Sequence, residues 1–260
     1  MIIWGKKMKV CFFDIDGTLA IDLDVPASAA LAIEKFRAQG NLVFICTGRP
    51  LPYVKQYFRQ YADGFICFNG RYAVLNDRVL YDVPLKKEEV NKIVKILDSC
   101  KAGYGFSNND SISSSLVGGY IHGTYNPFEY KDVPVYNFGV FFEDKAHFHR
   151  IEEALKEIVI LNPHGDAPHA DATILGSDKG TAIRAVCEQL NIPKEDSFAF
   201  GDGANDVCMM EAVGHGIAMG NALDVLKEKA SYITDPIDQD GVWNAMVHFD
   251  LMKESMPLNA

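Results

Sequence analysis

The first part of the chain alternates short apolar runs with segments in which apolar residues recur at helical spacing. The runs that predict buried strands are 10–13, 42–46 and 65–68. Between the first two runs, Ala29, Ile33 and Phe36 follow the helical pattern, and Gly40 ends the segment. Strands and helices that alternate in this way predict a parallel sheet with helices on both faces.

The same pattern returns towards the carboxyl end of the chain. Ile183, Val186 and Leu190 predict an amphipathic helix that begins at Lys179. The apolar run 198–200 follows and predicts a further buried strand. We therefore expect both ends of the chain to contribute to one sheet.

The pattern of hydrophobic and polar positions changes in the middle of the chain. Two amphipathic helices are predicted at 90–97 and 148–158, and they flank an aromatic-rich, strand-like stretch at 136–142. This pattern predicts a small α+β unit inserted into the larger one. The expected fold is an α/β class fold: a Rossmann-like, three-layer core at residues 1–84 and 173–260, with a smaller α+β cap at 85–172.

Two carboxylates follow the first predicted strand, at Asp14 and Asp16. At a strand end their side chains point to the same side of the sheet, in the crevice where open α/β folds bind ligands. Gly17 lets the backbone turn sharply there. Buried carboxylates this close repel each other unless a cation or a shared proton relieves them. The pair therefore indicates a nucleophile assisted by a metal beside a proton-transfer group, although a solvated Asp-Gly turn is the simpler alternative.

Other predicted strands also end in polar groups that suit phosphate. Thr47 offers a hydroxyl and Gly48 an exposed N–H, while Asn69 follows the third strand. Lys179 begins a helix, preceded by Asp178 as a possible cap, which makes a good anion site. Each has an alternative interpretation: Thr47 as a turn residue that caps the next helix, and Lys179 as a surface lysine.

The segment 201–206 is the strongest single signal after the first motif. It adds Asp202, Asn205 and Asp206 to the sheet edge that already carries Asp14 and Asp16. Four acidic residues could not converge there without cations. Oxygen-only ligation of this kind suits Mg²⁺, and Lys179 would neutralise part of the remaining charge.

Five groups of residues together resemble the haloacid dehalogenase superfamily, and most closely its Cof-type branch. Members of that branch are mostly phosphatases with an α/β cap between the second and third motifs. The stretches 216–222 and 240–242 are also similar to that branch. The five groups are Asp14-x-Asp16-Gly17-Thr18, Thr47-Gly48-Arg49, Asn69-Gly70, Lys179-Gly180 and Gly201-Asp202-Gly203-Ala204-Asn205-Asp206.

The resemblance implies a role for each matching residue. Asp14 would be the nucleophile that forms an aspartyl-phosphate, and Asp16 would protonate the leaving oxygen and then take a proton from water. Mg²⁺ would be held by the Asp14 carboxylate, the Asp16 main-chain carbonyl and Asp202, with Asn205 and Asp206 supporting or partly joining this set. The phosphoryl group would be bound by Thr47, Gly48, Lys179 and Asn69.

The expected function is that of a Mg²⁺-dependent phosphatase acting on small phosphomonoesters, such as sugar phosphates or related metabolites. In the family's dehalogenases and ion-pumping ATPases another residue stands in place of Asp16, so this carboxyl group favours hydrolysis. The alternative is a non-catalytic sensor of a phosphorylated metabolite, or a regulatory protein phosphorylated on Asp14. Substrate choice would lie in the cap, whose polar residues Tyr120, His122, Tyr125, His164 and His169 are candidates, although a surface or packing role is the simpler interpretation of each.

Composition and net charge limit which classes of partner the protein can bind. Among the 260 residues, 48% are hydrophobic and 23% are charged, which is typical of a globular protein. A net charge of −10 argues against nucleic acid or an anionic membrane as partner. The six cysteines form no Cys-x-x-Cys pair, and residues 1–7 lack the apolar core of a secretion signal. We expect reduced cysteines, a cytoplasmic location and a monomer or homodimer.

Overall fold

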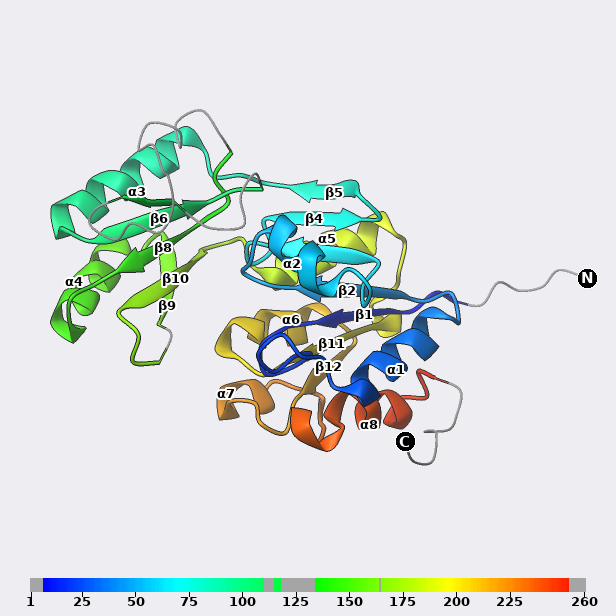
Figure 1. The fold of residues 1–260 in the computed structure, drawn as a ribbon. Helices are drawn as coiled ribbons and strands as arrows, with labels where there is room; N and C mark the ends of the chain where they lie inside the picture. Colours follow the sequence, from blue (N-terminus) through cyan, green and yellow to red (C-terminus); the bar gives the residue numbers. More distant parts are fainter. Residues whose placement is uncertain (1–6, 110–114, 118–133, 164, 253–260) are drawn as a thin grey trace, which may run out of the picture.

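The structure is a computed structural model that describes residues 7–109, 115–117, 134–163 and 165–252. These residues form an eight-stranded sheet and a five-stranded sheet, each with its own helices (Figure 1). The larger unit contains both ends of the described chain, and the smaller unit lies to one side of it (Figure 1).

The larger sheet has the strand order β13-β12-β11-β1-β2-β3-β4-β5. The strands from β13 to β3 run parallel, whereas β4 and β5 form an antiparallel hairpin at one edge. The strands are β1 (Val10–Phe13), β2 (Leu42–Cys46), β3 (Gly64–Cys67), β4 (Tyr72–Leu75), β5 (Arg78–Asp82), β11 (Ser197–Gly201), β12 (His215–Ala218) and β13 (Tyr232–Ile233).

Helices cover both faces of this sheet. On one face α1 (Ala27–Arg37) packs against α8 (Gly241–His248), and on the other α5 (Lys179–Gln189) packs against α6 (Val207–Ala212). Right-handed crossovers explain the two layers, because the chain moves in opposite directions along the sheet from β1 to β2 and from β11 to β12. The three-layer core expected from the sequence is thus confirmed. The remaining short helices of this unit are α2 (Leu51–Phe58), α7 (Asp224–Lys227) and the 3-10 segments Lys194–Asp196, Ala204–Asp206 and Ile237–Gln239.

Strand β1 lies at the centre of the sheet and is buried on both faces, which explains its continuously apolar sequence. Phe13 stacks on Phe200 of β11 with 4.4 Å between ring centroids, and Phe12 packs 5.5 Å from Phe44 of β2. These contacts fix the two strands next to β1 in register with it. The residue that follows β1, Asp14, is thereby held at the middle of the sheet edge.

The smaller unit, which we call the cap, is an antiparallel sheet with two helices on one face (Figure 1). Its strand order is β7-β6-β8-β10-β9, and α3 (Lys87–Cys100) packs against α4 (Lys145–Leu155). Its hydrophobic cluster runs from Leu85 to Ile174. The exact boundaries at 84 and 172 stay a prediction, and β10 continues two residues beyond the second one. The cap strands are β6 (Gly103–Ser107), β7 (Ser115–Val117), β8 (Asn137–Phe141), β9 (Val159–Pro163) and β10 (His169–Ile174).

The turn after β3 lies directly against the backbone at the start of α5. Gly70 has a φ of +98°, and a Cβ built there would lie 2.0 Å from the carbonyl oxygen of Asp178. Only glycine fits such a position, because it combines a left-handed backbone with a contact to main chain. This contact sets where α5, and therefore Lys179, begins.

We expect Gly70→Ala to lower the free energy of unfolding by more than about 3 kcal/mol, because backbone strain and overpacking add. The matched control is Gly40→Ala, since Gly40 has a similar φ of +82° but nothing within 4 Å of its Cβ position. Gly40→Ala should lower the free energy of unfolding by only about 1 kcal/mol, because it adds backbone strain without a clash. Urea unfolding of both variants measures the difference, and equal losses would show that the contact with Asp178 is unimportant.

Candidate active site

A cleft of about 800 Å³ opens where the parallel strands of the core end, between the core and the cap. The carboxyl ends of β1, β2, β3 and β11 all contribute to it, as expected for strands that share one direction. The sequence-predicted residues that line the cleft are Asp14, Asp16, Thr47, Gly48, Asn69, Asp202 and Asn205.

Lys179 lies directly behind this lining, as the first residue of α5. Its Nζ donates to Oδ1 of Asp14 at 2.6 Å and to Oδ1 of Asp206 at 2.7 Å. The side chain is only 1% exposed, so it is not the surface lysine of the simpler interpretation. Asp178 caps the helix by accepting from the N–H of Thr181 at 2.7 Å, which fixes the point at which the lysine enters the core.

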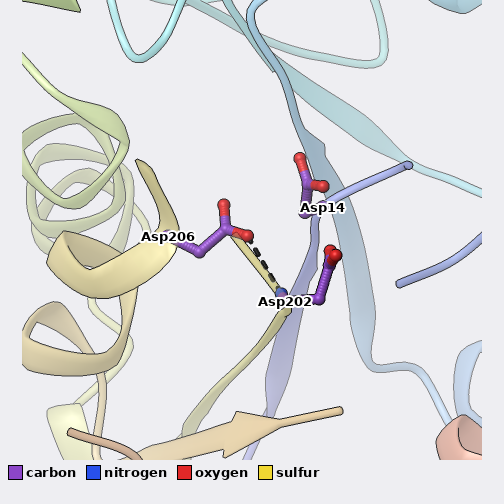
Figure 2. A group of neighbouring side chains, drawn as sticks. All are labelled: Asp14, Asp202 and Asp206. Carbon is purple, nitrogen blue, oxygen red and sulfur yellow. Dashed lines mark hydrogen bonds between the residues drawn. The ribbon is translucent and has the colours of Figure 1, made fainter. Parts of the chain in front are cut away.

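Asp206 is the second carboxylate that binds the ammonium of Lys179, and it is fully buried. Its Oδ1 accepts from Lys179. Its Oδ2 accepts from the N–H of Asp202 at 3.1 Å (Figure 2) and from the N–H of Gly203 at 3.0 Å. Both oxygens are therefore already engaged, Oδ1 with the ammonium and Oδ2 with the turn after β11. Asp206 therefore holds Lys179 and the turn after β11 and is not among the residues that line the cleft.

One carboxylate oxygen from each of Asp14, Asp202 and Asp206 lies within 4.8 Å of the other two (Figure 2). Asp14 and Asp202 come from neighbouring strand ends and face the cleft. Thr18 donates to Oδ1 of Asp202 at 2.8 Å, and a Cβ at Gly17 would lie 2.4 Å from Oδ2 of the same residue. The turn after β1 is thus closed tightly onto Asp202, which explains why glycine occupies position 17.

The charges at this cluster are not balanced. Burial and the neighbouring Asp206 raise the pKa of Asp14 to about 7. Burial also raises the pKa of Asp202 to about 6. Burial lowers the pKa of Lys179, but Asp14 and Asp206 outweigh it and hold that pKa above its usual range. One ammonium therefore compensates only part of the negative charge, and an oxygen-only donor set with excess negative charge fits a hard divalent cation.

Asp16 has a different environment from Asp14. Its side chain is 61% exposed, and both of its carboxylate oxygens accept from Nη2 of Arg49 at 2.9 Å. The Arg49 guanidinium in turn lies over the ring of Tyr53, 4.6 Å from its centroid, and donates to the Tyr53 hydroxyl. Both aspartates line the cleft, but the carboxylate of Asp16 is held by Arg49 and not by the cluster around Lys179.

Thr47, Gly48 and Asn69 form the wall of the cleft at the ends of β2 and β3. The Thr47 hydroxyl accepts from the N–H of Arg49 at 3.2 Å, so Thr47 shapes the turn as the alternative suggested. It does not cap the next helix, because the N-cap of α2 is Pro50, with no side-chain hydrogen bond. Asn69 is buried with a φ of +52°, and its Oδ1 has no hydrogen-bond partner among the described residues. A Cβ at Gly48 would lie 3.2 Å from that oxygen, so glycine gives Asn69 the room it occupies.

Several residues of the site were not singled out from the sequence. Arg49 and Thr18 belong to the recognised motifs, but the sequence assigned them no role. Asn221 is a further one: it closes the turn after β1 by donating to the carbonyl of Gly17 at 2.8 Å. Among the cap candidates only His169 is described, and it lines the cleft, whereas Tyr120, His122, Tyr125 and His164 lie outside the described residues. Asn162 and Asp171 of the cap also line the cleft. For Asp171 a signal was present, because residues 169–174 alternate between polar and apolar.

A family model described as haloacid dehalogenase-like hydrolase matches residues 11–246. The chain belongs to the haloacid dehalogenase-like hydrolases. The family resemblance and the hydrolase class expected from the motifs are therefore confirmed. Among the described residues of this hydrolase, none of the helices combines the length and hydropathy needed to cross a bilayer.

Three individual proteins illustrate what this hydrolase is similar to. "Putative phosphatase YkrA" of Bacillus subtilis is 31% identical, over 94% of this chain and 99% of the relative. The Bacillus subtilis protein named 5-amino-6-(5-phospho-D-ribitylamino)uracil phosphatase YcsE is 28% identical, over 94% and 96%. The solved structure of BT4131, named as a subclass IIB sugar phosphatase, superimposes with a TM-score of 0.78 at 28% identity, over 94% of this chain and all of that one. These matches confirm the α/β fold and the phosphatase branch.

Replacing Lys179 by Met should be strongly destabilising at pH 8, because two buried carboxylates would then lose their ammonium. We expect a loss of about 3–5 kcal/mol in the free energy of unfolding. The loss should be smaller at pH 5. A carboxyl whose folded-state pKa is raised, as for Asp14, binds protons more tightly when folded, so acid favours the folded state.

Urea unfolding at pH 5 and pH 8, with a chelator present, measures both losses. The matched control is Lys229→Met, because Lys229 is half exposed and pairs with Glu211 only at 3.9 Å. The control should change stability little at either pH. A loss for Lys179→Met that is the same at both pH values would contradict this account of the cluster.

Proposed function

We propose that the protein is a Mg²⁺-dependent phosphatase that hydrolyses small phosphomonoesters through an aspartyl-phosphate on Asp14. One observation carries the proposal: the buried ammonium of Lys179 holds Oδ1 of Asp14 at 2.6 Å, at the floor of a cleft that also contains Asp16. A nucleophile needs a fixed orientation and a nearby positive charge to receive a phosphoryl group, and this arrangement supplies both.

The first chemical step is assigned to Asp14 and Asp16. A carboxylate oxygen of Asp14 attacks phosphorus, and the bond between phosphorus and the ester oxygen breaks. The departing oxygen takes a proton from the carboxyl group of Asp16 and leaves as an alcohol. Asp16 suits this role because its side chain is the more exposed of the two and stands at the rim of the cleft, where the alcohol would depart.

The second step releases phosphate. Asp16, now a carboxylate, takes a proton from water as the water oxygen attacks phosphorus, and the bond to Asp14 breaks to give inorganic phosphate. Arg49 holds both oxygens of Asp16 and would keep the group near the cleft between the two steps. The transferred group would be bound by Lys179, the Thr47 hydroxyl, the Gly48 N–H and the amide of Asn69, all at the ends of neighbouring elements.

Mg²⁺ fits the residues present, because the cluster consists of carboxylates and carries more negative charge than Lys179 compensates. The residues that would hold it are Asp14, Asp202 and the main-chain carbonyl of Asp16, with Asn205 beside them and Asp206 in support. When bound, the ion would neutralise charge on the phosphoryl oxygens and on the attacking carboxylate.

The size of the cleft supports a small phosphorylated metabolite as substrate. About 800 Å³ is in the usual range for a small-molecule site, and the cap closes one side of it. The relatives named above include a sugar phosphatase and a phosphatase of a ribityl-pyrimidine. The same substrate class is therefore proposed for this protein.

Phosphate release from a panel of small phosphomonoesters tests the proposal. The wild type should release phosphate only with Mg²⁺ present, and Asp14→Asn should reduce the rate at least about 1,000-fold, because the nucleophile is lost. The matched control is Asp166→Asn, the same change at an exposed cap position outside the cleft, which should leave the rate as in the wild type. Binding of Mg²⁺ and phosphate analogues without release from any ester would instead support the sensor interpretation.

A further inference from the structure

The turn that follows β3 has a left-handed backbone at three successive residues. The φ angles are +54° at Phe68, +52° at Asn69 and +98° at Gly70. Glycine adopts this region freely and asparagine tolerates it, but a bulky residue such as phenylalanine is rarely found there. A residue in such a conformation persists only where its surroundings hold it. Contacts of the Phe68 side chain must therefore stabilise this turn.

A residue from the cap segment makes one of these contacts. Tyr136 immediately precedes the cap strand β8, yet its side chain packs in the hydrophobic cluster of the core. Its ring stacks on Phe68, with 4.9 Å between the ring centroids and 11° between the ring planes. Phe68 is 0% exposed and Tyr136 only 4% exposed. The residue with the unfavourable backbone is thus covered by an aromatic ring that the cap supplies.

Tyr136 is bound to the core through its side chain and to the cap through its backbone. Its hydroxyl donates to Oδ1 of Asp82, at the end of β5, at 3.0 Å. The ring of Tyr72 meets it edge-on, 5.5 Å from its centroid and at 68°. Its main-chain N–H donates to the carbonyl of Ser107, at the end of β6 in the cap, at 3.0 Å. Tyr136 therefore links the position of the cap sheet to the turn after β3.

Asn69 takes its position in the cleft wall from the same turn. Its main-chain N–H donates to the carbonyl of Thr47 at 3.0 Å. Its amide lies beside Gly48, because a Cβ built there would be 3.2 Å from Oδ1 and 3.3 Å from Nδ2. Nδ2 is 3.5 Å from Oγ1 of Thr173, and Oδ1 has no hydrogen-bond partner among the described residues. With so few hydrogen bonds of its own, the amide is oriented mainly by the backbone that carries it.

We propose that Tyr136 is a positioning residue for phosphoryl binding, because it holds Phe68 in the left-handed turn. The Asn69 amide is thereby placed beside the Gly48 N–H. This inference rests on the proposed function, in which that amide and that N–H bind the transferred group. Tyr136 itself is not among the described residues that line the cleft, so it acts through the turn. Without the stacked ring the turn would relax from its left-handed backbone and carry the amide away from the wall.

Two substitutions of Tyr136 separate the stacked ring from the hydroxyl. Tyr136→Leu removes the ring and should raise the Kd of inorganic phosphate, measured calorimetrically with Mg²⁺ present, about tenfold. For p-nitrophenyl phosphate, KM should rise by a similar factor while kcat changes less than about twofold, because the lost interaction is made in both the ground state and the transition state. Tyr136→Phe keeps the ring and should stay within about twofold of the wild type in all three quantities.

The matched control is Phe148→Leu, because Phe148 packs 5.0 Å from Phe142 within the cap's own hydrophobic cluster. It should leave the Kd of phosphate as in the wild type. A second background tests the route: Asn69→Gly removes the amide, and glycine suits the φ of +52°. In that background Tyr136→Leu should not raise the Kd further, because its effect passes through the missing amide. Urea unfolding verifies that each variant is folded under the assay conditions.

Three results would overturn the inference: the same phosphate Kd in Tyr136→Leu as in Phe148→Leu, an undiminished effect of Tyr136→Leu in the Asn69→Gly background, or a defect in Tyr136→Phe as large as that in Tyr136→Leu. A wild type that binds phosphate with Mg²⁺ but hydrolyses no ester would refute the proposed function, and the phosphate Kd values would still decide the role of Tyr136. The two failures are therefore distinguishable.

Discussion

The ammonium of Lys179, buried between the carboxylates of Asp14 and Asp206, connects three segments that are far apart in the chain. Asp14 ends the central strand, Lys179 begins the helix where the chain returns from the cap, and Asp206 shapes the turn after β11. Buried carboxylates so close together require a cation, and removal of that cation would leave uncompensated charge in the core. The position of the return segment, the turn after β11 and the orientation of Asp14 all depend on this one group.

The core and the cap contribute different groups to the cleft. The core supplies the groups that suit phosphoryl chemistry, because its parallel strands all end at one edge. The cap supplies residues of its sheet, among them Asn162 and Asp171, to the same cleft. Within the part of the chain that the structure describes, the crossings between core and cap lie after β5 and after β10, and Gly70 packs against the second crossing at Asp178. The placement of the cap is therefore tied to the helix that carries Lys179.

Much of the core could be predicted from the sequence because its strands are buried on both faces. Runs such as 10–13 and 42–46 have no polar face, so their ends, and the polar residues that follow, are unambiguous. Convergence of Asp14, Lys179 and Asp202 then follows from parallel topology. The hairpin of β4 and β5 was not predicted, since β5 is a half-exposed edge strand with weak apolar patterning.

Contacts between side chains from distant parts of the chain could not be predicted from the sequence. Arg49 pairs with Asp16, and Thr18 with Asp202, only because separate turns are brought together at the sheet edge. The pairing of Asn162 with Asp171 depends in the same way on the register of two cap strands. Motifs identified these segments but could not say which side chains touch, because local spacing does not determine tertiary distance.

The central claim is that Asp14 receives the phosphoryl group and that Asp16 is needed to release it. The most direct test uses Asp16→Asn with p-nitrophenyl phosphate, whose good leaving group needs no proton in the first step. An acid quench within the first turnover, followed by borohydride reduction, converts a phosphorylated aspartate to homoserine, which peptide mapping locates. The account predicts a burst of p-nitrophenol and homoserine at position 14. Steady turnover at the wild-type rate without a trapped intermediate, or homoserine at another position, would contradict it.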